Sequence, residues 1–380
     1  MAVYKLFPYK DTTLYSLYPD MNTGIDAITS ITNLNLAIDS LPQVSRFLTA
    51  FDQDEINSVI DEKINGAQWD VNLKSYIATA QGIVEATDLE VYPAAQYWYN
   101  GTGMFLDVPQ TTDGASWYSP NFKGSSAWLT GGTDAYGNAI SSSYASGSVG
   151  AGGGAWLYKS GSTNFVVSQS FDVRTTKDLN VNAKEVVSRW YSGSMDNNGF
   201  LVKWEDSVEF NPNVQIQPIM QFYSVDTNTI YPPELEFKWD DYSSVLTGSA
   251  TESILSTTNI VSSLAENPGE FLPESVHRFR FNVADKYPIR TWTTASKFTG
   301  VNYLPTSSYY AVKDLDTNEY VINFDTTYTK LSSDSEGNYL DLYMNGLEPE
   351  RYYKIMVKTT INSSTMVLDD SYYFKVVNGF

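Results

Sequence analysis

Two stretches of the chain decide the fold: Asn197–Lys203 reads NNGFLVK, and Tyr223–Phe237 reads YSVDTNTIYPPELEF. Each contains an apolar run typical of a strand, and clusters of polar turn residues separate the two. The double proline Pro232-Pro233 introduces the second strand. This layout is typical of the closing strands of a β-sandwich, and neither stretch contains groups arranged for catalysis.

Alternating apolar and polar residues predict further strands at 71–77, 89–92 and 235–239. A helix is expected over Asp52–Ile64, with Asp52 or Asp54 as N-cap and Gly66 beyond its end. Its apolar face would contain Ile56, Val59, Ile60 and Ile64. A second short helix is expected after Asn182, with Val186, Val187 and Trp190 on one face.

Residues 131–161 are rich in glycine and serine and include the run Gly150-Ala151-Gly152-Gly153-Gly154. Such a composition does not build a core of its own, so the segment is predicted to be a long surface loop inserted between strands. It lacks the Lys-Ser/Thr pair of a phosphate-binding P-loop.

A domain boundary is expected near residue 242, followed by a linker over 243–272 that contains the turn signal Asn267-Pro268-Gly269. From residue 273 onward, short alternating runs at 276–283, 309–324, 352–358 and 372–377 predict about five to seven strands. They indicate a compact sandwich of the immunoglobulin or fibronectin type III kind.

Composition restricts the classes of function. The chain has 44 acidic and 24 basic residues, a net charge of −20, and no Lys/Arg run, which disfavours nucleic acid as a partner. It has no cysteine and one histidine, His277, interpreted as structural. Cysteine-based metal sites are therefore excluded, and Ser-His-Asp catalysis nearly so.

The chain shows no signal-peptide pattern at Met1–Leu6 and no apolar run of about 18 residues. No membrane insertion is expected. The acidic cluster around the predicted helix, at positions 52, 54, 55, 61 and 62, is interpreted as a solvated helix face rather than a catalytic carboxylate pair. No motif supplies a nucleophile or base, so the chain is predicted not to be an enzyme.

Two sets of residues are candidate binding sites. Aromatic residues gather in the long loops between 97 and 128 and suit either glycan stacking or a contact between subunits: Tyr97, Trp98, Tyr99, Trp117, Tyr118 and Trp128. The segment Asp314–Asn318 resembles the start of a calcium-binding EF-hand loop. However, Glu319 stands where that loop needs glycine, so a hairpin turn is the favoured interpretation and no cofactor is expected.

Several short motifs occur in order from Tyr4 to Asp240. Together they resemble the DNRLRE (disaggregatase-related) domain, a jelly-roll β-sandwich of surface proteins and carbohydrate-binding modules. The motifs are Asn22-Thr23-Gly24, Arg46–Asp52, Leu89–Tyr92, Trp98 with Gly101 and Gly103, Gly114–Trp117, and Phe171–Val173 through Val186 and Trp190 to Asn197–Phe200. The resemblance implies an all-β fold with an N-terminal jelly roll over 1–242.

A second resemblance covers the whole chain and rests most clearly on Asp314–Ile322 and Met344–Tyr353. These segments look like those of structural proteins of contractile-tailed marine phages, especially cyanophages. The resemblance implies a virion protein, made in the host cytoplasm, that belongs to the neck, the tail or an attached fibre. Its expected partners are other neck, tail or baseplate proteins and further copies of itself in cyclic symmetry, and the alternative is a receptor-binding module for a host surface glycan.

Overall fold

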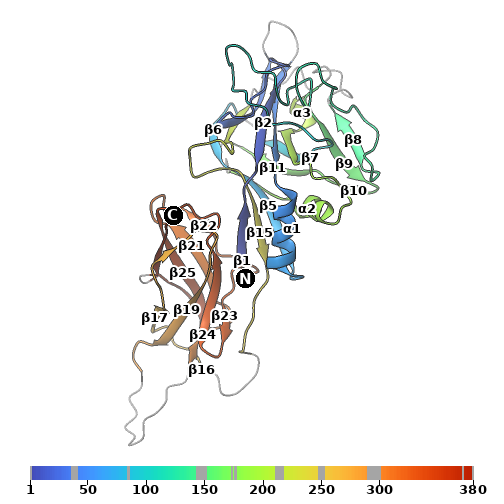
Figure 1. Cartoon of the computed structure of the whole chain (residues 1–380). Helices are drawn as coiled ribbons and strands as arrows, with labels where there is room; N and C mark the ends of the chain where they lie inside the picture. Colours follow the sequence, from blue (N-terminus) through green and yellow to red (C-terminus); the bar gives the residue numbers. More distant parts are fainter. Residues whose placement is uncertain are drawn as a thin grey trace, which may run out of the picture. The chain divides into compact units, whose positions relative to one another are not determined.

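The computed structural model describes residues 2–35, 42–83, 86–142, 152–172, 174, 178–209, 218–246, 253–288, 301–369 and 372–378. Within them the prediction of an all-β fold with a few short helices is confirmed (Figure 1). The chain forms two compact units. The large unit comprises Leu6–Lys63 and Asp70–Glu236, and the C-terminal unit comprises Met1–Lys5, Ile64–Trp69 and Phe237–Phe380.

The chain passes between the units within secondary-structure elements, namely β1 (Ala2–Leu6), the π-helix η1 (Val59–Ile64), β5 (Trp69–Ser75) and β15 (Glu234–Trp239). The boundary expected near residue 242 stays a prediction. The range 243–272, expected to be a linker, contains the strands β16 (Ser253–Ile254), β17 (Ile260–Ala265) and β18 (Glu270–Phe271).

In its described residues, the large unit is built on a sheet of eight strands. The order is β11-β7-β13-β4-β3-β14-β6, and β2 pairs with β4 as well. Their bounds are β2 Lys10–Tyr15, β3 Ile28–Asn35, β4 Pro42–Ala50, β6 Ile77–Gln81, β7 Thr87–Pro93, β11 Val167–Phe171, β13 Phe200–Trp204 and β14 Ile219–Tyr223. The neighbours pair antiparallel. Strand β13 is buried at every position, which explains why its sequence is a nearly continuous apolar run.

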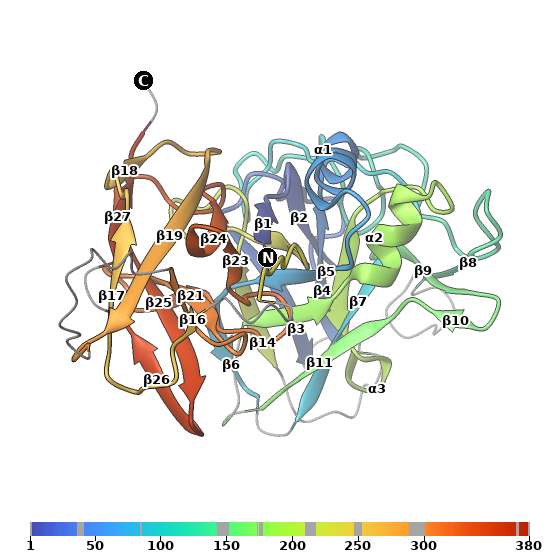
Figure 2. The same cartoon turned by 90° about the horizontal axis from the view of Figure 1, so that it is seen from below.

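Both predicted helices of the large unit are confirmed, and they lie side by side (Figure 2). α1 (Gln53–Ser58) begins at Asp52, whose carboxylate accepts hydrogen bonds from the amides of Asp54 and Glu55, and η1 continues it. α2 (Lys184–Tyr191) buries Val186, Val187 and Trp190. A third, α3 (Asp206–Glu209), follows β13. Strand β12 (Leu179–Asn182) pairs antiparallel with β5.

The prediction of a surface loop over 131–161 is wrong for two parts of it. Residues Ala139–Ser142 form β8 and Ala155–Ser160 form β9, which pair with each other and, through β9, with β10 (Thr163–Asn164). The reason is the apolar run Ala155-Trp156-Leu157, which is buried. Residues 143–151 lie outside the described residues.

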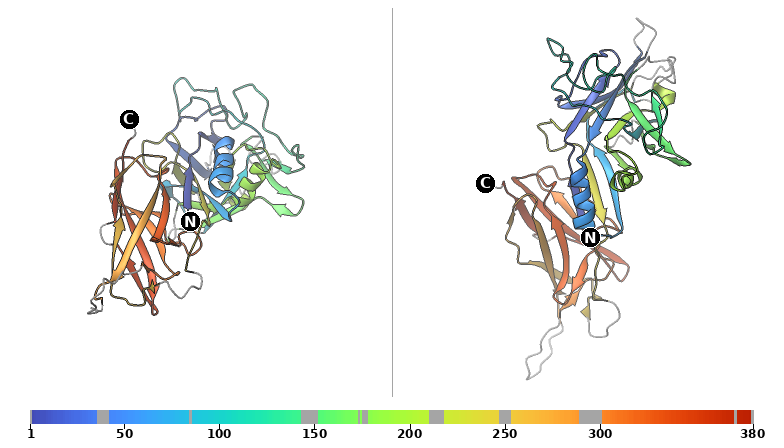
Figure 3. Two further views of the ribbon diagram at one scale, coloured as in Figure 1. Left: turned by 60° about the horizontal axis from the view of Figure 1, so that its bottom comes forward. Right: turned by 45° about the vertical axis from the view of Figure 1, so that its right-hand side comes forward.

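The C-terminal unit contains two main sheets that form facing layers, seen as orange and red strands in Figure 3. Among its described residues, one sheet has the order β17-β19-β24-β23, and the other β18-β27-β25-β21-β22 with β26 on β25. A short parallel pair joins β16 and β20. The remaining bounds are β19 Val276–Asp285, β20 Asn302–Tyr303, β21 Tyr309–Asp314, β22 Tyr320–Ile322, β23 Ser332–Asp334, β24 Gly337–Tyr343, β25 Arg351–Ile361, β26 Ser364–Leu368 and β27 Tyr373–Val376.

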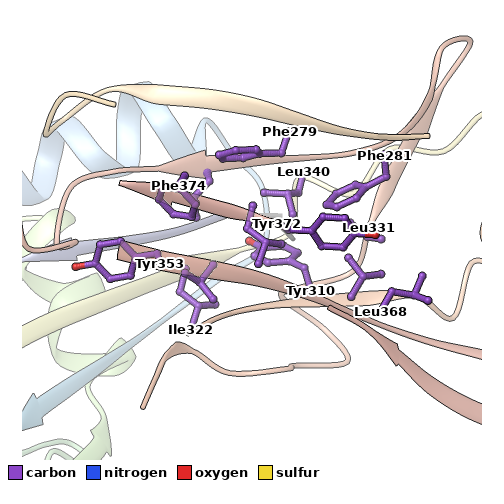
Figure 4. Close-up of a cluster of buried hydrophobic side chains, with 14 of the residues drawn as sticks. Phe279, Phe281, Tyr310, Ile322, Leu331, Leu340, Tyr353, Leu368, Tyr372 and Phe374 are labelled. Atoms are coloured by element: carbon purple, nitrogen blue, oxygen red, sulfur yellow. The ribbon is translucent and has the colours of Figure 1, made fainter. Parts of the chain in front are cut away.

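The core of this unit lies between the two sheets (Figure 4). Phe279 of β19 packs edge-on against Phe271 at 5.4 Å between ring centroids, and lies at the same distance from Phe374 of β27. The ring of His277 lies 4.6 Å from that of Phe271, and burial lowers the pKa of the histidine. These contacts agree with a structural role for His277.

The core contacts of Phe279 give a stability prediction. Phe279 is 1% exposed, so Phe279→Ala should lower the free energy of unfolding of the C-terminal unit by about 3–5 kcal/mol. The measurement is hydrogen exchange of β19 and β25 peptides in the full chain across a urea series. Val367→Ala, at a position 44% exposed, is the control and should change stability by less than about 0.5 kcal/mol. Equal effects of the two variants would contradict this assignment of the core.

Candidate functional site

The six aromatic residues predicted as a contact site divide into two groups. The tryptophans are buried, at 0% exposure for Trp98, 1% for Trp117 and 4% for Trp128. The tyrosines are about half exposed, at 53% for Tyr97, 53% for Tyr99 and 51% for Tyr118. The indole N–H of Trp98 donates to the Asn198 carbonyl at 2.9 Å, and that of Trp128 to the Ser116 carbonyl at 3.0 Å. Trp98 thus links the long loops to the segment before β13, and Trp128 links two parts of the loops to each other. A surface contact stays a prediction for the tyrosines.

A buried ion pair lies beneath these loops. Arg46 of β4 and Glu209 of α3 are both fully buried, and the guanidinium donates twice to the carboxylate, at 2.7 and 2.9 Å. A third donor of Arg46 reaches the Gly153 carbonyl at 2.6 Å. The guanidinium also lies over the rings of Trp117 and Trp156, at 5.2 and 5.1 Å. Bidentate pairing and flanking aromatic faces are the arrangement in which a desolvated arginine is best stabilised.

A second buried cation adjoins this pair. The Lys203 ammonium of β13 donates to Glu90 at 3.0 Å and to Asp206 at 2.6 Å, and lies 3.7 Å from Glu209. The Tyr92 hydroxyl donates to Glu90 at 3.0 Å, and burial is the main cause that raises the pKa of Tyr92. The carboxylates of this cluster thus bind cations of the chain itself.

A third buried cation, Lys10 of β2, lies against the predicted aromatic site. Its ammonium donates to the Trp98 carbonyl at 2.5 Å and lies 4.0 Å from the centroid of the Tyr97 ring. Burial lowers the pKa of Lys10 to about 8. The lysine therefore stabilises the backbone turn that presents Tyr97 and Tyr99 to solvent.

The loop that follows is clamped by one buried amide, that of Asn22. Its nitrogen donates to the Asn100 carbonyl at 2.7 Å and to the Ala115 carbonyl at 2.9 Å. Its oxygen accepts from the amides of Gly24 at 3.2 Å and Gly103 at 2.9 Å. Both donors and both lone pairs of this side chain are thereby used.

The glycines of this region allow the backbone to approach the clamp. A Cβ atom on Gly24 would lie 2.0 Å from the Asn100 carbonyl oxygen, and one on Gly103 would lie 2.3 Å from the Asn22 carbonyl oxygen. Neither position has room for a side chain without moving backbone atoms. The Asn-x-Gly and Gly-x-Gly motifs of the sequence are therefore the two sides of one clamp.

The clamped loop presents apolar side chains to solvent. Met104 is 46% exposed, Phe105 44%, Leu106 52% and Val108 96%, and we call these four residues the apolar loop. Leu106 has a left-handed φ of 59°, which costs a non-glycine residue about 1–2 kcal/mol. Such strain persists only where the surrounding structure determines the backbone conformation.

Hydrogen bonds within and next to the apolar loop fix its backbone conformation. The Asp107 carboxylate accepts from the Met104 amide at 2.7 Å and from the Thr111 hydroxyl at 3.0 Å. The Ile25 amide donates to the Gly103 carbonyl at 3.1 Å. The apolar loop is thus held in one conformation, so little conformational entropy remains to be lost when a partner covers it.

The segment Asp314–Asn318 forms the predicted hairpin turn between β21 and β22. The Asp314 carboxylate accepts from the amides of Asp316 and Thr317 and pairs with the Arg351 guanidinium at 2.6 and 2.9 Å. These contacts stabilise the turn. Across the described residues, no group of three or more His, Asp or Glu side chains could hold a metal ion. Nor does the described part of the chain contain a helix long and apolar enough to span a membrane.

No family model matches the chain, and no curated protein matches it in sequence.

Sequence reasoning missed the apolar loop, the Asn22 clamp and the cations at positions 10 and 203. The apolar loop could have been recognised from the sequence. It is an apolar run with neither the helical nor the strand period, and a proline follows directly: Met104-Phe105-Leu106-Asp107-Val108. The two carbonyls to which Asn22 donates lie 78 and 93 residues away along the chain, so no local pattern indicates them.

The clamp gives a testable prediction. Asn22→Ala leaves two buried carbonyls and two buried amides without their partner, so it should lower the free energy of unfolding of the large unit by at least about 2 kcal/mol. Hydrogen exchange at the Gly24 and Gly103 amides should become faster at the same time. Asn228→Ala, at an exposed position, is the matched control. Unchanged protection at Gly24 and Gly103 in Asn22→Ala would contradict the clamp.

Asp11 gives a prediction of pH dependence. It is 1% exposed, its Oδ2 accepts from the Val225 amide at 2.7 Å, and burial, together with the nearby Asp226 and Asp26, raises its pKa to about 8. Because the folded state holds the proton more tightly than the unfolded state, stability should fall as the pH rises from about 4 to about 8.

Asp11→Asn should remove this contribution to the fall of stability with rising pH. It should also make the chain more stable than the wild type at pH 8. Thermal unfolding over this pH range measures both effects. The exposed Glu62→Gln variant should retain the wild-type slope. An Asp11→Asn curve parallel to that of the wild type would refute the assignment.

Proposed function

We propose that the chain is a non-enzymatic structural component of a tailed-phage virion, of its neck, tail or an attached fibre, and that it acts by protein–protein assembly. The observation that carries the proposal is the apolar loop, a rigid surface segment with four exposed apolar side chains. Exposed apolar groups gathered in one place mark protein contacts, since their burial contributes about 25 cal/mol per Å². The virion as the place of assembly is supported by the sequence resemblance of Asp314–Ile322 and Met344–Tyr353.

The surroundings of the loop suit a contact between proteins. Leu17 and Ile25, at 45% and 40% exposure, add apolar surface from the segments after β2 and before β3. A core of apolar side chains with a polar, hydrated rim is the usual composition of a specific interface. The net charge of −20 would keep free copies soluble until a partner covers the loop.

The buried charges of the large unit have a structural role in this proposal. The carboxylates of Glu209 and Glu90 bind Arg46 and Lys203 at hydrogen-bond distances. Carboxylates committed in this way hold strands together and do not provide a free acid and base. We propose on this ground that the large unit is a scaffold for its loops.

The test uses particles of a phage that encodes this chain. The chain should be present in purified virions, and the double variant Leu106→Asp/Val108→Asp should be incorporated at least about tenfold less, because two charges would have to be buried at the contact. Quantitative mass spectrometry of purified particles measures both quantities. Leu272→Asp, at a position 54% exposed in the C-terminal unit, is the matched control and should be incorporated normally.

Two results would count against the proposal. Absence of the chain from purified particles, although infected cells contain it, would overturn the virion role. Normal incorporation of the double variant would show that the apolar loop is not the contact surface. Circular dichroism of the purified variants distinguishes a lost contact from a misfolded chain.

A further inference from the structure

A pocket of about 390 Å³ lies on the face of β3 and β14 that is opposite to the buried Ile31 and Met220. Its floor includes Ser30 of β3 and Ile219 and Gln221 of β14, strands that pair in antiparallel register with Gln221 opposite Ser30. This volume falls in the range of roughly 300–1,000 Å³ that is typical of small-molecule sites. All its lining residues belong to the large unit.

Aromatic side chains form one wall of the pocket. The ring of Phe105 lies 4.9 Å from that of Tyr15 and 6.0 Å from that of Tyr18. Phe105 is 44% exposed, and Tyr15 and Tyr18 are partly buried. The wall therefore offers aromatic surface to a ligand with a flat apolar face and polar edges.

The polar groups of the pocket point to a ligand rich in hydroxyl groups. The Oε1 atom of Gln43 is buried and accepts no hydrogen bond from the described residues. The Gln221 amide makes a long contact of 3.3 Å to the Ser30 hydroxyl, and Asp26 Oδ2 accepts from the Phe105 amide at 3.3 Å. A buried carbonyl oxygen without a donor costs about 1–3 kcal/mol, which a ligand hydroxyl could recover.

Charge narrows the class of ligand. None of the described residues that line the pocket is basic, and Asp26 is its one carboxylate, so an anion such as a phosphate has no counter-charge there. Burial raises the pKa of Asp26, and hydrogen bonds from the amides of Phe105 and Ala27 lower it in part. Such a carboxylate is stabilised by hydroxyl donors.

We propose that this pocket binds a neutral saccharide. One pyranose ring would lie against Phe105 and Tyr15, with hydroxyls that donate to Gln43 and Asp26 and accept from the Gln221 amide. The site is separate from the exposed tyrosines at 97, 99 and 118. The proposal does not depend on the assembly function, because its test uses the isolated chain and variants at Gln43 and Gln221, which lie outside the apolar loop.

The experiment is saturation-transfer difference NMR of the full chain with methyl glycosides of glucose, galactose, mannose and N-acetylglucosamine. Each sugar is used at about 10 mM, which detects complexes with Kd near 1 mM. At least one sugar should bind, and Gln43→Ala and Gln221→Ala should each weaken its binding about tenfold. Gln81→Ala, an exposed position on the neighbouring strand β6, should leave binding unchanged.

Three results would overturn the proposal. The first is the absence of a signal with all four sugars. The second is binding that neither glutamine variant weakens while circular dichroism shows both to be folded, since the sugar would then occupy another site. The third is binding of lysine methyl ester but of no neutral sugar, which would identify Asp26 as a site for cationic groups.

Discussion

The ion pair between Arg46 and Glu209 is the interaction on which the large unit depends. Both groups are fully buried, and the effective cost of desolvating each ion is several kcal/mol. Two hydrogen bonds to the carboxylate and a third to the Gly153 carbonyl offset that cost only in one geometry. The pair therefore ties together β4, α3 and the segment before β9, which are far apart in sequence.

The consequences of this pair extend to the loops. The Arg46 guanidinium lies over the rings of Trp117 and Trp156, so the position of this guanidinium fixes where the segment that contains Trp117 packs. Trp117 and Trp98 are both buried, which fixes both ends of the segment that contains the apolar loop. Asn22 then fixes the path of the backbone between them. The strained leucine at 106 is tolerated because the structure around it is already determined.

The helices and many of the strands were predictable because their signals are local, whereas the strands within 131–161 and 243–272 were missed. Asp52 was one of two N-cap candidates, with Asp54, that the spacing of the following apolar residues indicated, and the structure has Asp52 as the cap. The strand at β13 was recognisable from its composition. Motif residues proved to be organisers of the backbone: a Cβ on Gly199, in the Asn-Asn-Gly-Phe motif, would lie 2.2 Å from the Thr49 carbonyl oxygen, and Asn197 donates to the Phe51 carbonyl at 2.9 Å. The pocket on β3 and β14 was not predicted, because the residues that line it come together only in the folded chain. Gln221 and Ser30 of the pocket are 191 residues apart.

Phe105 belongs both to the apolar loop and to the wall of the pocket, and this shared position has a thermodynamic consequence. A protein partner that covers Phe105 would change the environment of a sugar in the pocket, and a bound sugar would change the surface offered to the partner. By linkage, the factor by which one ligand alters the affinity of the other is the same in both directions. Because the clamp fixes the loop, the coupling would act through direct contact at this shared surface, which also includes Leu17, rather than through a conformational change of the sheet. If the protein partner and the sugar both need the exposed face of Phe105, assembly and glycan binding would compete. If the bound sugar supplies part of the surface that the protein partner covers, each would strengthen the other.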